Sequence, residues 1–361
     1  VVSEQGLGKN EYVETHKKLI IVTAPGPGSG KMATCLSQLY HAQLRGKKAG
    51  YAKYETFPIW NIPLNHSVNL AYEAATADLN DVNMIDPFHL EHYKKTATNY
   101  NRDIESFPLL KAIFSAIYGE SPYKSPTDMG VNKIQPAIID EEIAIQASKE
   151  EIIRRFYKVS KFTYIGKYQD SSVTKVQMLM NKLGISIKDR KCVEPCLKKA
   201  SQSESPSMAL ELNDGRIVTG KRSELLGAPA ALLLNALKTL AGIDDDTLLI
   251  APEILIPISR VKTDSLHNLN PRLHPEEVLI ALAIQAGSNP ICKQALDKLP
   301  LLCGTQAHSS VILQEVDFNL YEKLGVKKVL VVTGRHVGKS IAPPIIDHIR
   351  ANGLDAVHYS E

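Results

Sequence analysis

The 361-residue sequence lacks several features that would assign it to a class at once. No segment approaches the roughly 18 to 20 apolar residues that span a bilayer, and no signal peptide is visible. Aromatic residues make up 6% of the chain, with a single tryptophan, and the formal net charge is only +3. So small a charge, with no basic stretch that includes stacking residues, argues against nucleic acid as a partner. We therefore expect a cytoplasmic protein that contacts neither membrane nor nucleic acid.

Cysteine is also scarce, with five residues that lie far apart except for Cys192 and Cys196. Their CxxxC spacing lacks the second Cys or His pair that a zinc site needs. We expect two reduced thiols here, and the sequence assigns no metal site.

One stretch near the N-terminus does carry a functional signal, KLIIVTAPGPGSGKMATC, residues 18–35. Five apolar or β-branched residues, 19–23, predict a buried strand, and a glycine-rich loop then leads into a predicted helix at 31–44. Such a loop directs backbone N–H groups and a helix dipole toward an anion, and a lysine adds a mobile charge. The predicted phosphate or nucleotide contacts are Gly26, Gly28, Ser29, Gly30, Lys31 and Thr34.

The match to a phosphate loop is incomplete, because Pro25 replaces its first glycine and Met32 replaces its Ser or Thr. The Ser or Thr hydroxyl of a phosphate loop normally helps to hold magnesium. Thr34, on the next helical turn, is the candidate to replace it. The alternative is an ordinary turn, rich in glycine and proline, between a strand and a helix. The implied cofactor is ATP or another nucleotide with magnesium.

The remaining pattern predicts an α/β fold. We expect a P-loop-like domain with a parallel sheet and a helical extension over residues 1–160, with a second strand at 49–56. A separate α+β domain follows at 161–326, with a hairpin around Asn213-Asp214-Gly215. Further predictions are helices at 71–80, 108–118, 141–157, 173–183, 228–241 and 275–286, a helix beginning near 89, strands at 247–250 and 311–313, and an exposed linker at 198–207.

Other polar groups are weaker candidates. Asp140 resembles a magnesium-binding aspartate after a strand, but the helix behind it favours a role as N-cap. His274 and His308 stand in small-residue loops, where catalysis is less common than a structural role. TGRHVGKS, residues 333–340, favours an ordinary turn. A further cluster of acidic and imidazole groups is a candidate for metal binding or acid–base chemistry, and the alternative is a solvated helix end. Its residues are Asp78, Asp81, Asp86, His89, Glu91 and His92.

Long strings of residues 6–326 resemble an uncharacterised bacterial family, the domain of unknown function numbered 1846. They include VTAPGPGSGK, GYAKYETFPIWNIPLNH, NLAYEAATADLNDVNMIDPFHL, SPYKSPTDMGVN, NPRLH and GTQAHSS. The resemblance implies a P-loop-like N-terminal domain and a separate C-terminal α+β part, without an established activity. It also implies a segment before Gly6 that is missing here, so we expect a truncated first sheet.

Residues 327–361 resemble instead the opening βαβ unit of iron-containing alcohol dehydrogenases, without that family's iron ligands. The sequence thus predicts a fusion with a short βαβ tail. The leading hypothesis is a protein that binds a nucleotide or other phosphorylated small molecule, as a nucleotide-dependent transferase or hydrolase. The alternatives are a non-catalytic, homo-oligomeric binding or scaffold protein and an oxidoreductase-related fragment. The sequence assigns no catalytic residue.

Overall fold

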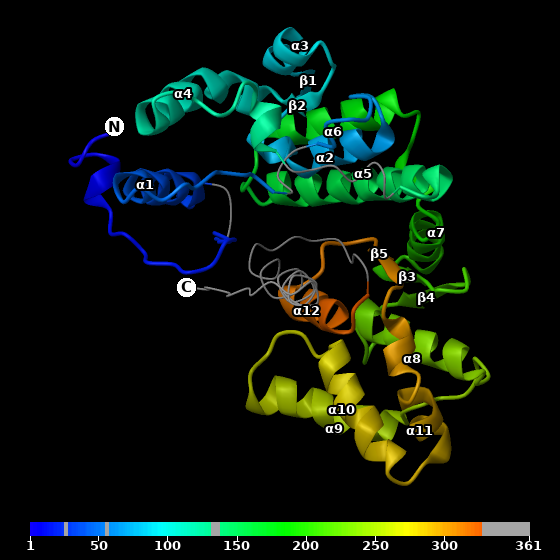
Figure 1. The fold of residues 1–361 in the computed structure, drawn as a ribbon. Helices are drawn as coiled ribbons and strands as arrows, with labels where there is room; N and C mark the ends of the chain where they lie inside the picture. The colour runs from blue at the N-terminus through cyan, green and yellow to red at the C-terminus, as the bar shows by residue number, and fades with distance from the viewer. Residues whose placement is uncertain (25–27, 55–57, 131–137, 327–361) are drawn as a thin grey trace. The chain divides into compact units, whose positions relative to one another are not determined.

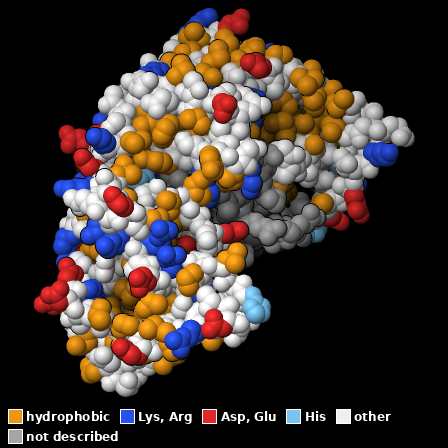
Figure 2. Space-filling model, turned by 180° about the vertical axis from the view of Figure 1, so that it is seen from behind, with side chains coloured by type: hydrophobic (Ala, Val, Ile, Leu, Met, Phe, Trp, Pro, Cys, Tyr) orange, Lys and Arg blue, Asp and Glu red, His pale blue; other side chains and the backbone are white. Residues whose placement is uncertain are grey.

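A computed structural model describes residues 1–24, 28–54, 58–130 and 138–326 (Figure 1). The described chain forms two compact units, Val1–Lys149 and residues 150–326. No helix in these residues is long and apolar enough to cross a membrane. On the face drawn in Figure 2, basic and acidic side chains are interspersed, as expected for a net charge of +3. The predicted tail, residues 327–361, and its TGRHVGKS string lie outside the described residues.

The first unit is mainly helical. Its helices include α1 (Lys31–Leu44), whose bounds match the prediction, and α4 (Asn101–Tyr118). Apolar residues at helical spacing give each of these helices one buried face, and the two faces form a shared core with Leu36, Leu39, Phe107 and Phe114. The remaining elements are α2 (Ser67–Ala75), β1 (Asn83–Ile85), α3 (Pro87–Tyr93), β2 (Thr98–Tyr100) and α5 (Glu141–Tyr164), which continues into the second unit.

The prediction of a parallel sheet in this unit is wrong. Its one described sheet pairs β1 with β2 in antiparallel register, with Asn83 opposite Tyr100. Residues 19–23 form no strand, and Leu19 and Ile20 are more than half exposed. An apolar run becomes a strand only where a neighbour accepts and donates its backbone hydrogen bonds, and no described strand pairs with this one. Of the second predicted strand, the described residues 49–54 form a single bridge, between Lys53 and Gly130.

The second unit is built on a three-stranded antiparallel sheet in the order β4–β3–β5. The predicted hairpin is confirmed: β3 (Ser207–Glu211) and β4 (Ile217–Lys221) flank the turn, where Gly215 has φ +85°. Helix α8 (Ala228–Ala241) packs closely on β4. The contact requires glycine at position 220, because a Cβ on Gly220 would lie 2.2 Å from the backbone nitrogen of Leu232. The other elements are α6 (Asp170–Lys182), α7 (Val193–Ser203), α9 (Pro252–Arg260), α10 (Pro275–Ala286), α11 (Pro290–Leu296), β5 (Gln306–Ser309) and α12 (Glu315–Lys323).

Mixed α/β character is therefore confirmed, and the helices predicted at 228–241 and 275–286 have the predicted bounds. Three local predictions are wrong. The expected linker at 198–207 is largely the end of α7, and residues 247–250 and 311–313 are not strands. The last strand is instead β5, whose residues pair with β3. The two wrong strand predictions share one cause: short apolar runs do not reveal the neighbours that decide their conformation.

Candidate functional site

A pocket of about 290 Å³ lies in the second unit, beside the N-terminus of α8. Its wall combines positive and apolar side chains with the carboxylate of Asp317. Arg222, Arg272 and His274 contribute the nitrogen groups, and Val311 and Ile312, each about half exposed, contribute apolar surface. A concave site with a few convergent polar groups on an apolar wall is typical of small-molecule binding.

One wall is the NPRLH string, residues 270–274, which neighbouring backbone holds in place. Leu273 N donates to Leu225 O at 2.8 Å, and Gly227 N donates to Leu273 O at 3.1 Å. The loop is also held from behind by Lys262, whose Nζ donates to Arg272 O at 2.7 Å. Lys262 is buried in a π-helical turn, Val261–Ser265, that extends α9. The string is therefore a rigid support that positions Arg272 and His274.

His274 is fixed at both its backbone and its ring. As N-cap of α10, it donates its backbone N–H to Glu277 Oε2 at 2.7 Å. Its ring Nδ1 lies 2.8 Å from Asp317 Oδ1, near the start of α12. Burial raises the pKa of the Asp317 carboxyl, and the hydrogen bond from His274 opposes this rise. Because Asp317 accepts from Nδ1, Nε2 is the ring nitrogen that remains for a ligand.

The positive side of the pocket has two further components. Arg222 follows β4 and is exposed, whereas Arg272 is anchored through Nε, which donates to Ser223 O at 2.9 Å. Gly227 is the N-cap of α8 and makes no side-chain cap, and Pro229 has no N–H, so the first-turn N–H groups without an intrahelical acceptor are those of Ala228 and Ala230. Arginine forks and a helix N-terminus both favour anions, and phosphate in particular. The arrangement can bind an anionic group next to an apolar one.

The predicted phosphate loop is present only in part. Gly28 (φ +75°) and Gly30 (φ +84°) take left-handed conformations, and Gly30 is the N-cap of α1 without a side-chain cap. Lys31 Nζ lies 3.2 Å from Ser29 Oγ, while Thr34 is exposed and bonded through its backbone to Gly30. The strand that should support the loop is absent, and Gly26 lies outside the described residues. Phosphate binding by this loop therefore stays a prediction.

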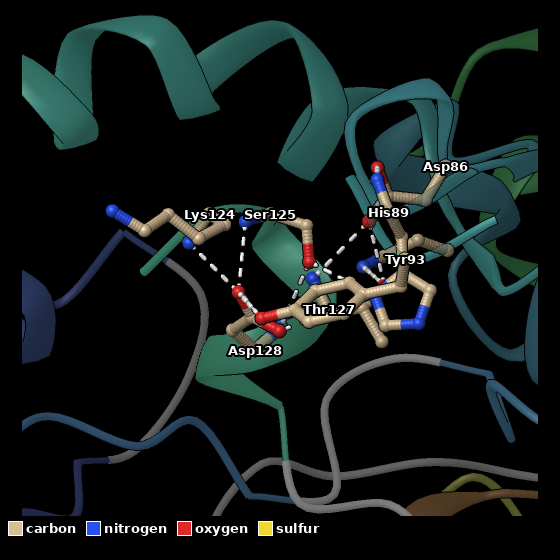
Figure 3. A network of polar contacts seen from close by, with 8 residues as sticks. Asp86, His89, Tyr93, Lys124, Ser125, Thr127 and Asp128 are labelled. Atoms are coloured by element: carbon tan, nitrogen blue, oxygen red, sulfur yellow. Dashed lines mark hydrogen bonds and ion pairs between the residues drawn. The ribbon is translucent and has the colours of Figure 1, made fainter. Parts of the chain in front are cut away.

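The acidic and imidazole segment divides between two places. Asp81 is buried and pairs with Arg102 at 2.9 Å, whereas Glu91 and His92 are exposed on α3. Asp86 and His89 instead join a polar network with a 3₁₀ turn, Pro126–Met129 (Figure 3). Among the described residues, no group of three or more His, Cys, Asp or Glu side chains could hold a metal ion.

This network has a structural role, because it ties α3 to the turn at Pro126–Met129. Asp86 is fully buried and accepts from three donors, His89 N at 3.0 Å, Thr127 N at 3.2 Å and Thr127 Oγ1 at 2.6 Å. Ser125 and Asp128 form a capping box, and Ser125 Oγ lies 3.1 Å from His89 Nδ1 (Figure 3). Burial lowers the pKa of His89, so its imidazole stays neutral.

Two smaller predictions concern Asp140 and His308. Asp140 is confirmed as the N-cap of α5, because its Oδ1 accepts from Ile143 N at 3.0 Å.

His308 lies in β5 with its ring 4.7 Å from the ring of Tyr157. Burial, followed by the charge of Arg190, lowers the pKa of His308 to about 4. His308 is therefore a buried histidine on an edge strand of the sheet, and the choice between a structural and a catalytic role stays a prediction.

Comparison with known proteins defines the family. Residues 1–184 match the model described as Domain of unknown function DUF1846, N-terminal, and residues 188–331 match its C-terminal counterpart. The chain belongs to the DUF1846 family. Relatives in this family include UPF0371 proteins of Streptococcus thermophilus and Streptococcus pyogenes, each 56% identical over 326 residues, and one of Streptococcus pneumoniae, 54% identical. Each alignment covers 90% of this chain and 66% of the relative, so the chain spans slightly under two thirds of the relatives' length.

The pocket residues were not predicted as a group from the sequence, although NPRLH is one of the strings that resemble the DUF1846 family. Arg222, His274 and Asp317 lie on three separate segments. Only the fold of the second unit brings them together. The signal that was available is the pairing of Arg272 and His274 in one short loop before a helix, which favours an anion site over a lone loop histidine.

Proposed function

We propose that this chain binds a phosphorylated small molecule and that the pocket beside α8 is the binding site. One observation carries the proposal: Arg222, Arg272, His274 and the uncapped start of α8 line the same pocket. Guanidinium groups bind phosphate oxygens through charge-assisted hydrogen bonds, which are about twice as strong as neutral ones. The apolar wall at Val311 and Ile312 suits a ligand that also carries an apolar part.

The test is a titration of the protein with inorganic pyrophosphate, followed by NMR. Arg222→Gln should weaken binding by about tenfold, because one charge-assisted contact is lost. The matched control is Lys221→Gln, which removes the same charge from the neighbouring residue on β4, outside the pocket. It should leave affinity nearly unchanged. Equal losses in the two variants would indicate nonspecific attraction, and the pocket would then be excluded.

The loop before α1 is the second candidate for the phosphate. Its two left-handed glycines and the uncapped helix start support anion binding, and Lys31 adds a charge. Met32 stands where a magnesium-holding hydroxyl is expected, and it packs against the α1–α4 core. The same titration separates the two sites. If Lys31→Ala abolishes pyrophosphate binding while Arg222→Gln does not, the site is the loop.

A further inference from the structure

The His274–Asp317 pair sets the chemistry of the pocket. Asp317 is 6% exposed, and its Oδ1 lies 2.8 Å from His274 Nδ1. The nearby charged groups are already engaged: Lys262 Nζ donates to Glu277 Oε2 at 2.9 Å, and Glu277 also accepts from His274 N. The buried Tyr321 hydroxyl donates to Pro229 O at 2.7 Å. Asp317 is therefore the carboxylate that faces the imidazole directly.

We propose that the pocket selects a phosphate monoester, and that His274, protonated at both ring nitrogens, donates from Nε2 to that phosphate. This inference rests on the proposed function and adds the class of ligand. Asp317 stabilises the imidazolium through Nδ1, and Arg222 and Arg272 provide the other two positive groups. The additional proton comes from solvent when the ligand binds.

The number of charges supports this assignment. A phosphate monoester carries a charge of about −1.5 to −2 at pH 7 and has three terminal oxygens, whereas a phosphodiester carries a single charge. The two guanidinium groups (+2) and the Asp317 carboxylate (−1), which also lines the pocket, together carry a net charge of +1, and this already balances a diester. A third cationic donor adds affinity mainly for an anion with a second charge, and it must keep its proton while the ligand is bound. The buried carboxylate of Asp317 accepts from Nδ1 at 2.8 Å, which leaves Nε2 as the nitrogen that can donate to the ligand.

The test compares methyl phosphate with dimethyl phosphate, two small probes that do not depend on the rest of the pocket. We expect the wild-type protein to bind methyl phosphate at least about tenfold more tightly in NMR titrations. Both probes are compared at pH 7, where methyl phosphate carries most of its second charge and dimethyl phosphate carries a single charge.

Asp317→Asn is the decisive variant, because asparagine keeps the size and one acceptor oxygen but removes the charge. It should abolish the preference for methyl phosphate. Glu276→Gln is the matched control, since it removes a carboxylate two residues from His274 that does not line the pocket. It should behave like wild type. His274→Gln provides a second test if Asp317→Asn does not fold.

The outcomes separate the two proposals. If neither probe binds the wild-type protein, the proposed function fails. If methyl phosphate binds the wild-type protein no more tightly than dimethyl phosphate, or if Asp317→Asn and His274→Gln both keep the preference, then the pocket binds phosphate without the histidine. In that case only the present inference is overturned.

Discussion

Each of the two units holds a histidine through its Nδ1, and the two differ in the partner. In the first unit, His89 meets the hydroxyl of Ser125 at 3.1 Å, whereas in the second, His274 meets the carboxylate of Asp317 at 2.8 Å. Ser125 is fully buried and already accepts from Asp128 N, so its own proton is best donated to His89. Nδ1 of His89 thus accepts from a hydroxyl, whereas Nδ1 of His274 donates to a carboxylate.

The difference extends to what surrounds each ring. Around His89, the capping groups Asp86 and Asp128 satisfy backbone donors, and the result is a tie between α3 and the turn at Pro126–Met129. Around His274, similar capping leaves the ring beside a pocket with two arginines. A similar cluster of polar side chains therefore stabilises the fold in one unit and, we propose, binds a ligand in the other. Four predictions test this contrast, from the largest expected effect to the smallest.

Removing the buried carboxylate of the first network should have the largest effect. Asp86→Ala leaves Thr127 and His89 donors without an acceptor and removes the N-cap of α3. We expect the free energy of unfolding to fall by about 3 to 5 kcal/mol in urea titrations. Asp78→Ala, at an exposed carboxylate, should cost less than about 0.5 kcal/mol. A small loss in Asp86→Ala would contradict the structural role of this network.

In the second unit, the corresponding buried charge is Lys262. Lys262→Met keeps the stem but removes the donor to Arg272 O and Glu277, so we expect a loss of about 2 to 4 kcal/mol. Pyrophosphate binding should weaken as well, because the NPRLH string loses its support. Lys323→Met is the control, since its surface pair with Glu276 should contribute less than about 1 kcal/mol. Unchanged binding in a folded Lys262→Met protein would show that the string is positioned without it.

A third histidine, His308, tests the effect of burial without a charged hydrogen-bond partner. An unfolded histidine has a pKa near 6.5, whereas burial lowers that of His308 to about 4. The folded state therefore resists protonation, and stability present above about pH 6.5 is lost as the pH falls toward 4. The loss from this residue should reach about 2 kcal/mol at pH 4.5. In urea titrations, His308→Leu should lose correspondingly less stability than the wild type between pH 7 and pH 4.5. An equal loss in the two proteins would mean that His308 does not contribute to the pH dependence of stability.

The sequence was sufficient for elements whose own pattern defines them. Helices α1, α8 and α10 have an apolar face at helical spacing, and Gly46 and Gly242 follow the ends of two of them, so their bounds could be predicted. It was insufficient for α7, because its Lys- and Ser-rich exposed face hides the buried Val193 and Cys196. It was also insufficient at 19–23, where an apolar run has no described partner strand.

The candidate site was harder to predict for a related reason. His274 and Asp317 are 43 residues apart, and neither stands in a pattern that names the other. Arg222 follows an ordinary hairpin strand, with no motif around it. The glycine-rich loop at 28–31, by contrast, carried a strong local signal, but the strand that should support it is absent. A motif predicts local backbone reliably, whereas a binding site depends on contacts that only the fold creates.

The smallest expected effect is at the exposed edge of the first network. Tyr93 donates its hydroxyl to Asp128 Oδ2 at 3.1 Å, but its side chain is 41% exposed and Asp128 already accepts from Lys124 N and Ser125 N. Tyr93→Phe should therefore cost about 0.5 kcal/mol or less in urea titrations, because water can replace the lost donor. A loss above about 2 kcal/mol would mean that the network depends on its surface bond. The tie between α3 and the turn at Pro126–Met129 would then depend on Tyr93 as well as on the buried Asp86.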